Sequence, residues 1–293
     1  MSAFDKDNDP LKDKKVLARH IETALAVDPP AGLGLEMSYR LVKRMFDPIF
    51  VGEENLPDKP CLFVGNHSLF ALDGWVLAPV MLKEFDRFLR GLGDKFLFAN
   101  KGIGDRVLQF GGVMGHPDVC SAMMKDGQDL VVFPGGAHEA VKSAKDMYEL
   151  QWKERYGFVK LAAKHGYTIM PFGMVGPDEF YGHLIEGQDI PDTAVGQLLR
   201  RMGLLTDDTR SDMLPPIPVG AMGTIMPKPQ RCYVGFGEPV DLASYKGRVP
   251  AKKQQQTIRA QVAEQIEMQL AELLFLRTQS RGQDSLLRRL LTL

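Results

Sequence analysis

Short apolar runs and helical spacings alternate along the middle of this 293-residue chain. Apolar runs typical of buried strands are CLFVGN (61–66), KFLFAN (95–100), DLVVFPGG (129–136), YTIMPFGMVG (167–176) and RCYVGFGEPV (231–240). Segments with helical spacing lie between them at 107–110, 119–124 and 156–165. Strands that alternate with helices predict an α/β layer fold, and we expect one such domain.

The two ends of the chain carry different patterns. Residues 11–26 predict a helix that stops at the breaker cluster 28–32, and 36–50 predict a short basic amphipathic helix that either packs on the domain or lies on a membrane. Residues 184–227 are rich in Gly, Pro and Asp around a helix near 197–202, and we interpret them as an excursion that could cover a site. Apolar positions in 254–276 share one helical face, and the tail 277–293 is basic and amphipathic.

Composition narrows the class of protein. The chain is 44% apolar and 25% charged with a formal net charge of −1, which is globular and excludes a disordered chain or a basic nucleic-acid binder. The three cysteines are far apart, so neither a disulfide framework nor a zinc site is indicated. Charges occupy the first 15 residues, where a signal peptide needs an apolar stretch, and no uncharged apolar run is long enough to span a bilayer. We therefore expect a protein inside the cell whose membrane contact, if any, is peripheral.

A histidine and a carboxylate follow the first apolar run. His67 lies just past the expected strand, and Asp73 lies at an expected helix start. If the chain turns between them, Asp73 can accept the proton of one ring nitrogen and leave the other basic enough to deprotonate an alcohol. The alternative is a buried structural histidine with Asp73 as a helix N-cap.

The run that ends in Phe133-Pro134-Gly135-Gly136 is the second candidate. Glycines there allow a ligand to approach the backbone and leave N–H groups for an oxyanion or a phosphate. The alternative is a tight turn from strand to helix.

Together these segments resemble the glycerolipid acyltransferase superfamily, whose signatures are N-H-x4-D and F-P-E-G-T-R. FPGGAHEA, the following RYGFVKLAAKHGYTIMPFGMVGPDEFY and the later GFGEPVDL are similar to its diacylglycerol-acyltransferase-like and phytyl-ester-synthase-like branch. The resemblance runs from about residue 48 to 245.

The resemblance implies a single three-layer domain with a mostly parallel mixed sheet flanked by helices. From the patterns along the chain we expect the acyltransferase domain at 36–276, with 1–35 as a helical appendage, 184–227 as a possible lid and 277–293 as the tail. By the resemblance, His67 becomes the general base and Asp73 its partner, and the substrate-binding positions are Asn66, Pro134, Gly135, Gly136, His138, Glu139 and Pro171. An acyl group would pass directly from acyl-CoA or acyl-carrier protein to a lipid hydroxyl, with no metal or other cofactor, on the cytoplasmic face of a membrane.

Two departures from the signatures bear on this expectation. Five residues separate His67 from Asp73, one more than in the signature. His138 and His116 stand where arginines bind phosphate in other members, and a neutral imidazole lacks the bidentate charge of a guanidinium. We therefore expect a neutral glycerolipid or a long-chain alcohol as acceptor. A lysophospholipid or glycerol-phosphate acyltransferase and a catalytically impaired lipid-binding protein remain as alternatives.

Other classes have weaker support. The chain contains no G-x-S-x-G for a serine hydrolase and no H-E-x-x-H for a metalloprotease. GLGLEM and GLGDKF lack the last glycine of a dinucleotide-binding loop.

Overall fold

The computed structural model describes residues 13–68, 71–98, 101–140, 142, 144–185, 197, 217–280, 282, 284 and 286–292. The chain divides into two compact units, and each is described by itself. The first unit comprises 1–175 with 231–279, and the second comprises 176–230 with 280–293.

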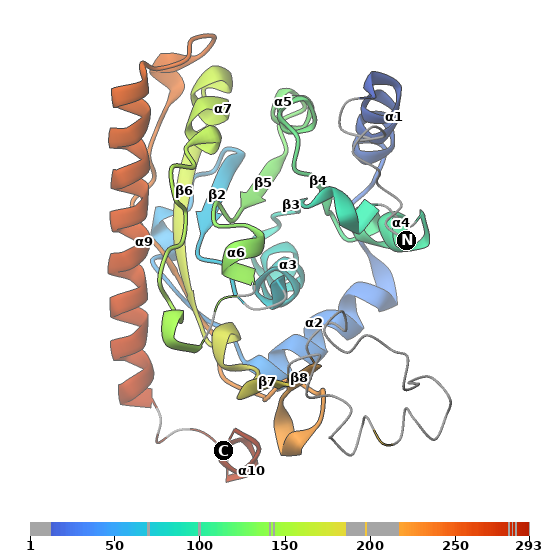
Figure 1. The fold of residues 1–293 in the computed structure, drawn as a ribbon, viewed down its shortest axis with the longest axis vertical. Helices are drawn as coiled ribbons and strands as arrows, with labels where there is room; N and C mark the ends of the chain where they lie inside the picture. Colours follow the sequence, from blue (N-terminus) through green and yellow to red (C-terminus); the bar gives the residue numbers. More distant parts are fainter. Residues whose placement is uncertain are drawn as a thin grey trace. The chain divides into compact units, whose positions relative to one another are not determined.

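A seven-stranded sheet forms the centre of the first unit (Figure 1). Its strands are β1 (Ile49–Val51), β2 (Cys61–Gly65), β3 (Leu89–Gly93), β4 (Val113–Met114), β5 (Asp129–Val132), β6 (Thr168–Val175) and β9 (Tyr233–Phe236), in the order β1-β9-β6-β2-β5-β3-β4. Among the described strands of this sheet, β6 and β9 pair in antiparallel fashion and the other pairs are parallel. Every residue of β2 and β6 is buried, as expected for strands covered on both faces. The predicted α/β fold with a mostly parallel mixed sheet is confirmed.

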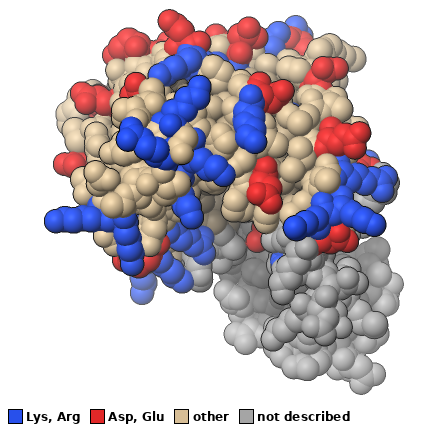
Figure 2. Space-filling model, turned by 90° about the horizontal axis from the view of Figure 1, so that it is seen from above, with Lys and Arg blue, Asp and Glu red and all other residues tan. Residues whose placement is uncertain are grey.

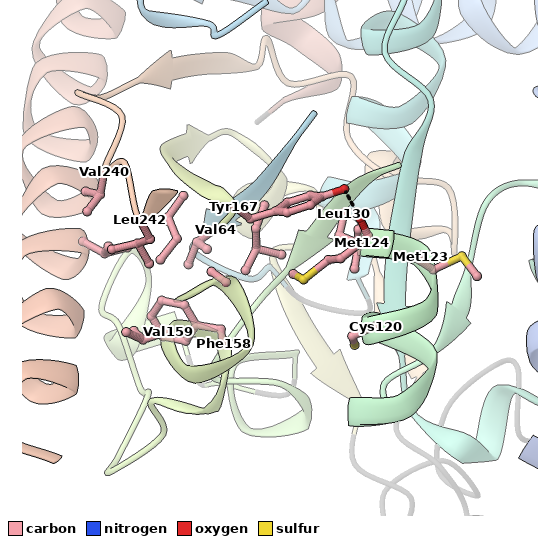
Figure 3. Packing of buried hydrophobic residues seen from close by; sticks show 14 of the residues in the cluster. Val64, Cys120, Met123, Met124, Leu130, Phe158, Val159, Tyr167, Val240 and Leu242 are labelled. Atoms are coloured by element: carbon pink, nitrogen blue, oxygen red, sulfur yellow. Dashed lines mark hydrogen bonds between the residues drawn. The ribbon is translucent and has the colours of Figure 1, made fainter. Parts of the chain in front are cut away.

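Helices and short 3₁₀ turns connect these strands. The α-helices of the first unit are α1 (Lys14–Leu25), α2 (Gly32–Phe46), α3 (Leu72–Phe85), α4 (Lys101–Gln109), α5 (Pro117–Lys125), α6 (Ala137–Ala140), α7 (Gly157–His165) and α9 (Lys252–Ser280, whose last residue falls in the second unit). Its 3₁₀ turns are η1 (Glu53–Asn55), η3 (Lys95–Phe98), η4 (Ala144–Asp146) and η9 (Ala243–Tyr245). Part of the core lies between the sheet and helices α5 and α7, where Val64 and Leu130 meet Met124 and Val159 in one buried cluster (Figure 3).

Helix α9 runs along the sheet beside β6 (Figure 1). Its buried residues Ile258, Val262, Ile266, Leu270 and Leu273 are those that share one face in the sequence pattern. Close approach depends on glycine, because a Cβ on Gly173 of β6 would lie 3.0 Å from the Cβ of Gln269. The predicted helix at 254–276 is therefore confirmed, with an extension to Ser280.

Three details of the pattern come out differently. Residues 95–98 of KFLFAN form η3 rather than a strand, and the strand of this region is β3, which the pattern missed. Short apolar runs do not distinguish a strand from a turn of helix, and the glycines and Arg90 of LRGLG concealed β3. The helix expected at 36–50 begins at Gly32 and ends at Phe46, because Asp47 adopts a left-handed conformation (φ 41°) and Pro48 follows it.

The helix expected as an appendage is tied into the core. Leu17 and Ala24 of α1 belong to the main buried cluster, and the buried His20 accepts a hydrogen bond from the backbone of Met114 at 3.0 Å. The 36–276 domain boundary stays a prediction.

The second unit contains a two-stranded antiparallel sheet of β7 (His183–Ile185) and β8 (Ile217–Val219). It also contains η5 (Pro177–Glu179), η8 (Ala221–Gly223) and α10 (Leu286–Leu291). Apart from Gln197, the helix expected near 197–202 lies outside the described residues.

Charged side chains and the lengths of the helices bear on what the surface can contact. Basic and acidic side chains are interspersed over the face drawn in Figure 2. None of the described helices combines the length and the apolar composition needed to cross a bilayer.

Candidate active site

His67 and Asp73 meet where β2 ends. The Nδ1 atom of His67 lies 2.8 Å from Oδ2 of Asp73, and the two residues are 8% and 1% exposed. The chain turns back between them: the N–H of Ala71 donates to the Ser68 carbonyl, and Ala71 adopts a left-handed conformation (φ 58°). The Asp73 carboxylate also accepts the backbone N–H groups of Ser68 and Gly74. The additional residue between the two side chains is thus accommodated in the turn.

Phe133 forms one wall of this site. Its ring is stacked on the imidazole of His67, with centroids 4.3 Å apart and planes 5° from parallel. Phe133 directly precedes Pro134, so the two predicted segments are in contact through this pair of rings. The ring also limits the orientations of the imidazole.

Pro134, Gly135 and Gly136 form the turn between β5 and α6. The N–H of Gly136 donates to the Phe133 carbonyl at 2.9 Å, and Gly136 has a positive φ of 54°. Nη1 of Arg155 donates to the carbonyls of Pro134 and Gly135 at 3.0 and 2.8 Å. This arginine therefore supports the turn from outside.

Asn66 and Pro171 lie inside the protein framework. The amide of Asn66, 2% exposed, donates to the Met174 carbonyl at 3.0 Å and accepts the Met174 N–H at 2.8 Å. Pro171 pairs with Val64 within the sheet. Both residues position the strand ends, and a direct contact of either with substrate stays a prediction.

His116 and His138 are the two positions expected to disfavour phosphorylated acceptors, and Glu139 follows His138 in the chain. His116 is the N-cap of α5, and its Nδ1 accepts the backbone N–H of Asp118 at 3.2 Å. The side chain of His138 lies outside the described part of α6. Glu139 is fully buried, and its Oε1 accepts the backbone N–H of Gln151 at 2.8 Å.

Charges around His67 favour its protonated form. Burial favours the neutral ring and lowers the pKa of His67, but the carboxylates of Asp73 and Glu139 outweigh it and leave that pKa above its ordinary value. Burial raises the pKa of the Glu139 carboxyl. The site can therefore hold a proton taken from a substrate.

Sequence reasoning did not identify three residues of this site. Lys142 is buried, and its Nζ donates to the His67 carbonyl at 2.9 Å. Ser68 Oγ accepts the Asp73 N–H, and Arg155 supports the glycine turn. Arg155 begins the RYGFVK segment quoted above, but the pattern assigned it no role; a lone lysine or serine resembles any surface residue. Within the described residues, no group of three His, Cys, Asp or Glu side chains is placed to hold a metal ion.

Comparisons with known proteins show the family of this chain. A family model described as Diacylglycerol acyltransferase matches residues 117–272, and one described as Acyltransferase matches residues 48–175. The first match covers more than half of the chain, and the chain belongs to the diacylglycerol acyltransferase family. The resemblance found in the sequence is confirmed.

Individual relatives are distant. The chain is 28% identical over 241 residues to phytyl ester synthase 1, chloroplastic, of Arabidopsis thaliana, with 77% of this chain and 34% of the relative covered. It is 30% identical over 120 residues to the DGAT1/2-independent enzyme synthesizing storage lipids of Gallus gallus, covering 41% of this chain and 36% of the relative. The crystal structure of the 1-acyl-sn-glycerophosphate acyltransferase PlsC from Thermotoga maritima aligns with a TM-score of 0.47 and 16% identity over 89% of this chain and 83% of that chain. The chain spans about a third of the length of the phytyl ester synthases that it matches.

Proposed function

We propose that this protein is an O-acyltransferase that moves a fatty acyl group from acyl-CoA or acyl-carrier protein to a hydroxyl of a neutral lipid, with His67 as the general base. The observation that carries the proposal is the 2.8 Å contact between His67 and Asp73 at the end of β2, beside the Pro134-Gly135-Gly136 turn. Family membership supports it.

The chemistry follows from the tautomer of His67. Asp73 accepts the Nδ1 proton, so Nε2 is free to take the proton of the acceptor hydroxyl. The oxygen attacks the thioester carbonyl, and a backbone N–H of the glycine turn other than that of Gly136, which donates to the Phe133 carbonyl, stabilises the oxyanion. The intermediate then collapses to the ester, the C–S bond breaks, and the thiolate takes the proton from the imidazolium.

The geometry also bears on the impaired-enzyme alternative. That alternative rested on the long spacing between His67 and Asp73, and the turn at Ala71 closes this spacing to hydrogen-bond distance. No other observation favours a protein that binds lipid without reacting.

A neutral acceptor is supported by the contacts that His116 and Arg155 already make. His116 is engaged in capping α5, and Nη1 of Arg155 is engaged with two carbonyls. The relatives named above, by their printed names, synthesise phytyl esters and storage lipids. Diacylglycerol, monoacylglycerol or a long-chain alcohol are therefore the acceptors we propose.

We also propose that the protein works at the surface of a membrane. Helix α2 buries Val42 and Phe46 but leaves Leu33, Met37 and Leu41 exposed along one stripe. Arginines 40 and 44 are exposed on the same helix, as in helices that lie on anionic lipid.

The decisive experiment compares wild type with His67→Ala, using labelled acyl-CoA and diacylglycerol. Loss of a positioned base should lower the rate on the order of 10²–10⁴-fold, with an unchanged circular dichroism spectrum. His165→Ala is the matched control, because His165 lies at the end of α7, where its Nε2 is 3.0 Å from the Ser121 hydroxyl of α5. Full activity in folded His67→Ala would refute the proposal.

A further inference from the structure

Two buried side chains of opposite charge lie against His67 and have no role in the steps above. Both come from the segment that follows the glycine turn: Glu139 is on α6, and Lys142 is three residues further on. Buried charges cost free energy unless other groups compensate them. The contacts of Glu139 and Lys142 therefore indicate what these two charged residues do beside His67.

Lys142 holds the main chain of His67. It is 8% exposed, and its Nζ donates to the His67 carbonyl at 2.9 Å. The two residues are 75 positions apart in sequence. This bond joins the loop after β2, which carries the imidazole, to the segment that follows the glycine turn.

Glu139 lies under the glycine turn. Its Oε1 accepts the Gln151 N–H, and a Cβ at Gly135 would collide with its Cδ. Only a residue without a side chain leaves room for the carboxyl at that place. The carboxylate also interacts electrostatically with both His67 and Lys142.

We infer that Glu139 and Lys142 are a pair of positioning residues that hold the His67 loop and the glycine turn together and balance the charge around the imidazole. This inference rests on the proposed role of His67. It gives Glu139 a place under the turn, distinct from the substrate contact that the family resemblance implies.

The pair has opposite effects on proton uptake by His67. The charged groups that interact with the ring are Asp73 from α3, Glu139 from α6 and Lys142 beyond it, while Phe133 contributes an uncharged face. Lys142 disfavours the imidazolium and Glu139 favours it. Removing them one at a time should shift the pKa of His67 in opposite directions.

The test is the NMR titration of ring-labelled histidines in the full chain, with the His67 signal identified by its absence in His67→Ala. Lys142→Met should raise the pKa of His67 and Glu139→Gln should lower it, because the first variant removes a positive charge beside the ring and the second a negative one. The double variant should return close to wild type. Lys164→Met and Glu149→Gln, both exposed, are the matched controls and should leave the pKa unchanged.

Kinetics supply the second readout. In Lys142→Met and Glu139→Gln, kcat should fall at least tenfold with little change in KM, and the acidic limb of the pH profile should move with the measured pKa. Glu139→Gln keeps the shape of the side chain, so its effect on the pKa of His67 tests the inference even if Lys142→Met does not fold.

Two outcomes would overturn the inference: the pKa of His67 moves in the same direction in both variants, or it does not move in either. If wild type transfers no acyl group, the proposed function fails, whereas the NMR titration still decides whether the pair acts on His67.

Discussion

Gly135 shows how one missing side chain allows the site to form. The Glu139 carboxyl occupies the space where a Cβ would be. We expect Gly135→Ala to cost about 1–3 kcal/mol of unfolding free energy, the usual cost of overpacking, and to lower activity as the turn moves. Urea unfolding measures the change in unfolding free energy, and an acyl-transfer assay measures the change in activity. Gly157→Ala is the control, because no atom lies within 4 Å of a Cβ there, and it should be neutral.

Asp73 sets the protonation of His67. Its carboxylate raises the pKa of the imidazole, so Asp73→Asn should move the acidic limb of kcat/KM to lower pH while lowering the rate at the plateau. An unchanged pH profile would contradict this role. The function of Asp73 would then be structural, through its hydrogen bonds from the Ser68 and Gly74 N–H groups.

The same contact makes stability depend on pH. The folded pKa of His67 lies above its unfolded value, so the stabilisation is fully present below the unfolded pKa and is lost as pH rises through the folded pKa. The difference in unfolding free energy between wild type and His67→Gln should therefore shrink as pH rises from 6 to 9. Chemical denaturation at several pH values measures it, and a difference that grows with pH would contradict the assignment.

The contacts of His116 and Arg155 bear on which acceptor the protein uses. With His116 used as a helix cap, diacylglycerol, monoacylglycerol or a long-chain alcohol should be turned over faster than lysophosphatidic acid or glycerol 3-phosphate. A side-by-side panel with one acyl-CoA measures this. A clear preference for the phosphorylated acceptors would refute it and would make Arg155 the first phosphate contact to mutate.

At the scale of elements, α2 carries the prediction of membrane binding. Replacing Leu33, Met37 and Leu41 together with Ser should abolish sedimentation with anionic vesicles, because the apolar stripe is lost while the buried face of the helix is kept. Met268→Ser with Phe275→Ser, both exposed on α9, is the matched control. Wild-type binding should weaken with salt.

The tail is tested in the same assay. Helix α10 spans only Leu286–Leu291, and its Arg288 pairs with Asp284 at 3.4 Å. A chain that ends at Ser280 keeps all of α9 and should still bind the vesicles if α2 is the main contact. Loss of binding in that chain alone would transfer the role to the tail.

For the whole molecule, the cysteines report on cooperative unfolding. Cys61, Cys120 and Cys232 are 0–2% exposed, and burial raises the pKa of Cys61 and of Cys120 to about 12. A disulfide reagent should not label the native protein at pH 8, and all three thiols should react in concentrated guanidinium. Glu149→Cys adds an exposed thiol that should react at once. Rapid labelling of the other three in the native state would mean that the core opens locally.

The sequence by itself determined the fold class. Strands buried on both faces must be apolar throughout, so β2, β5, β6 and β9 could be recognised from their composition. Strand β3 could not, because the buried Arg90 within it is accommodated by a hydrogen bond to the Ala24 carbonyl from a distant helix.

The sequence also named His67, Asp73 and the glycine turn, because these residue types stand in a recognisable order. Only the tertiary structure showed that Asp73 reaches the imidazole, that Asn66 bonds to Met174 and that Lys142 holds the His67 carbonyl. The last two contacts join residues 108 and 75 positions apart. Hydrophobic periodicity encodes which face of an element is buried, whereas contacts of this kind depend on where loops from separate strands end in space.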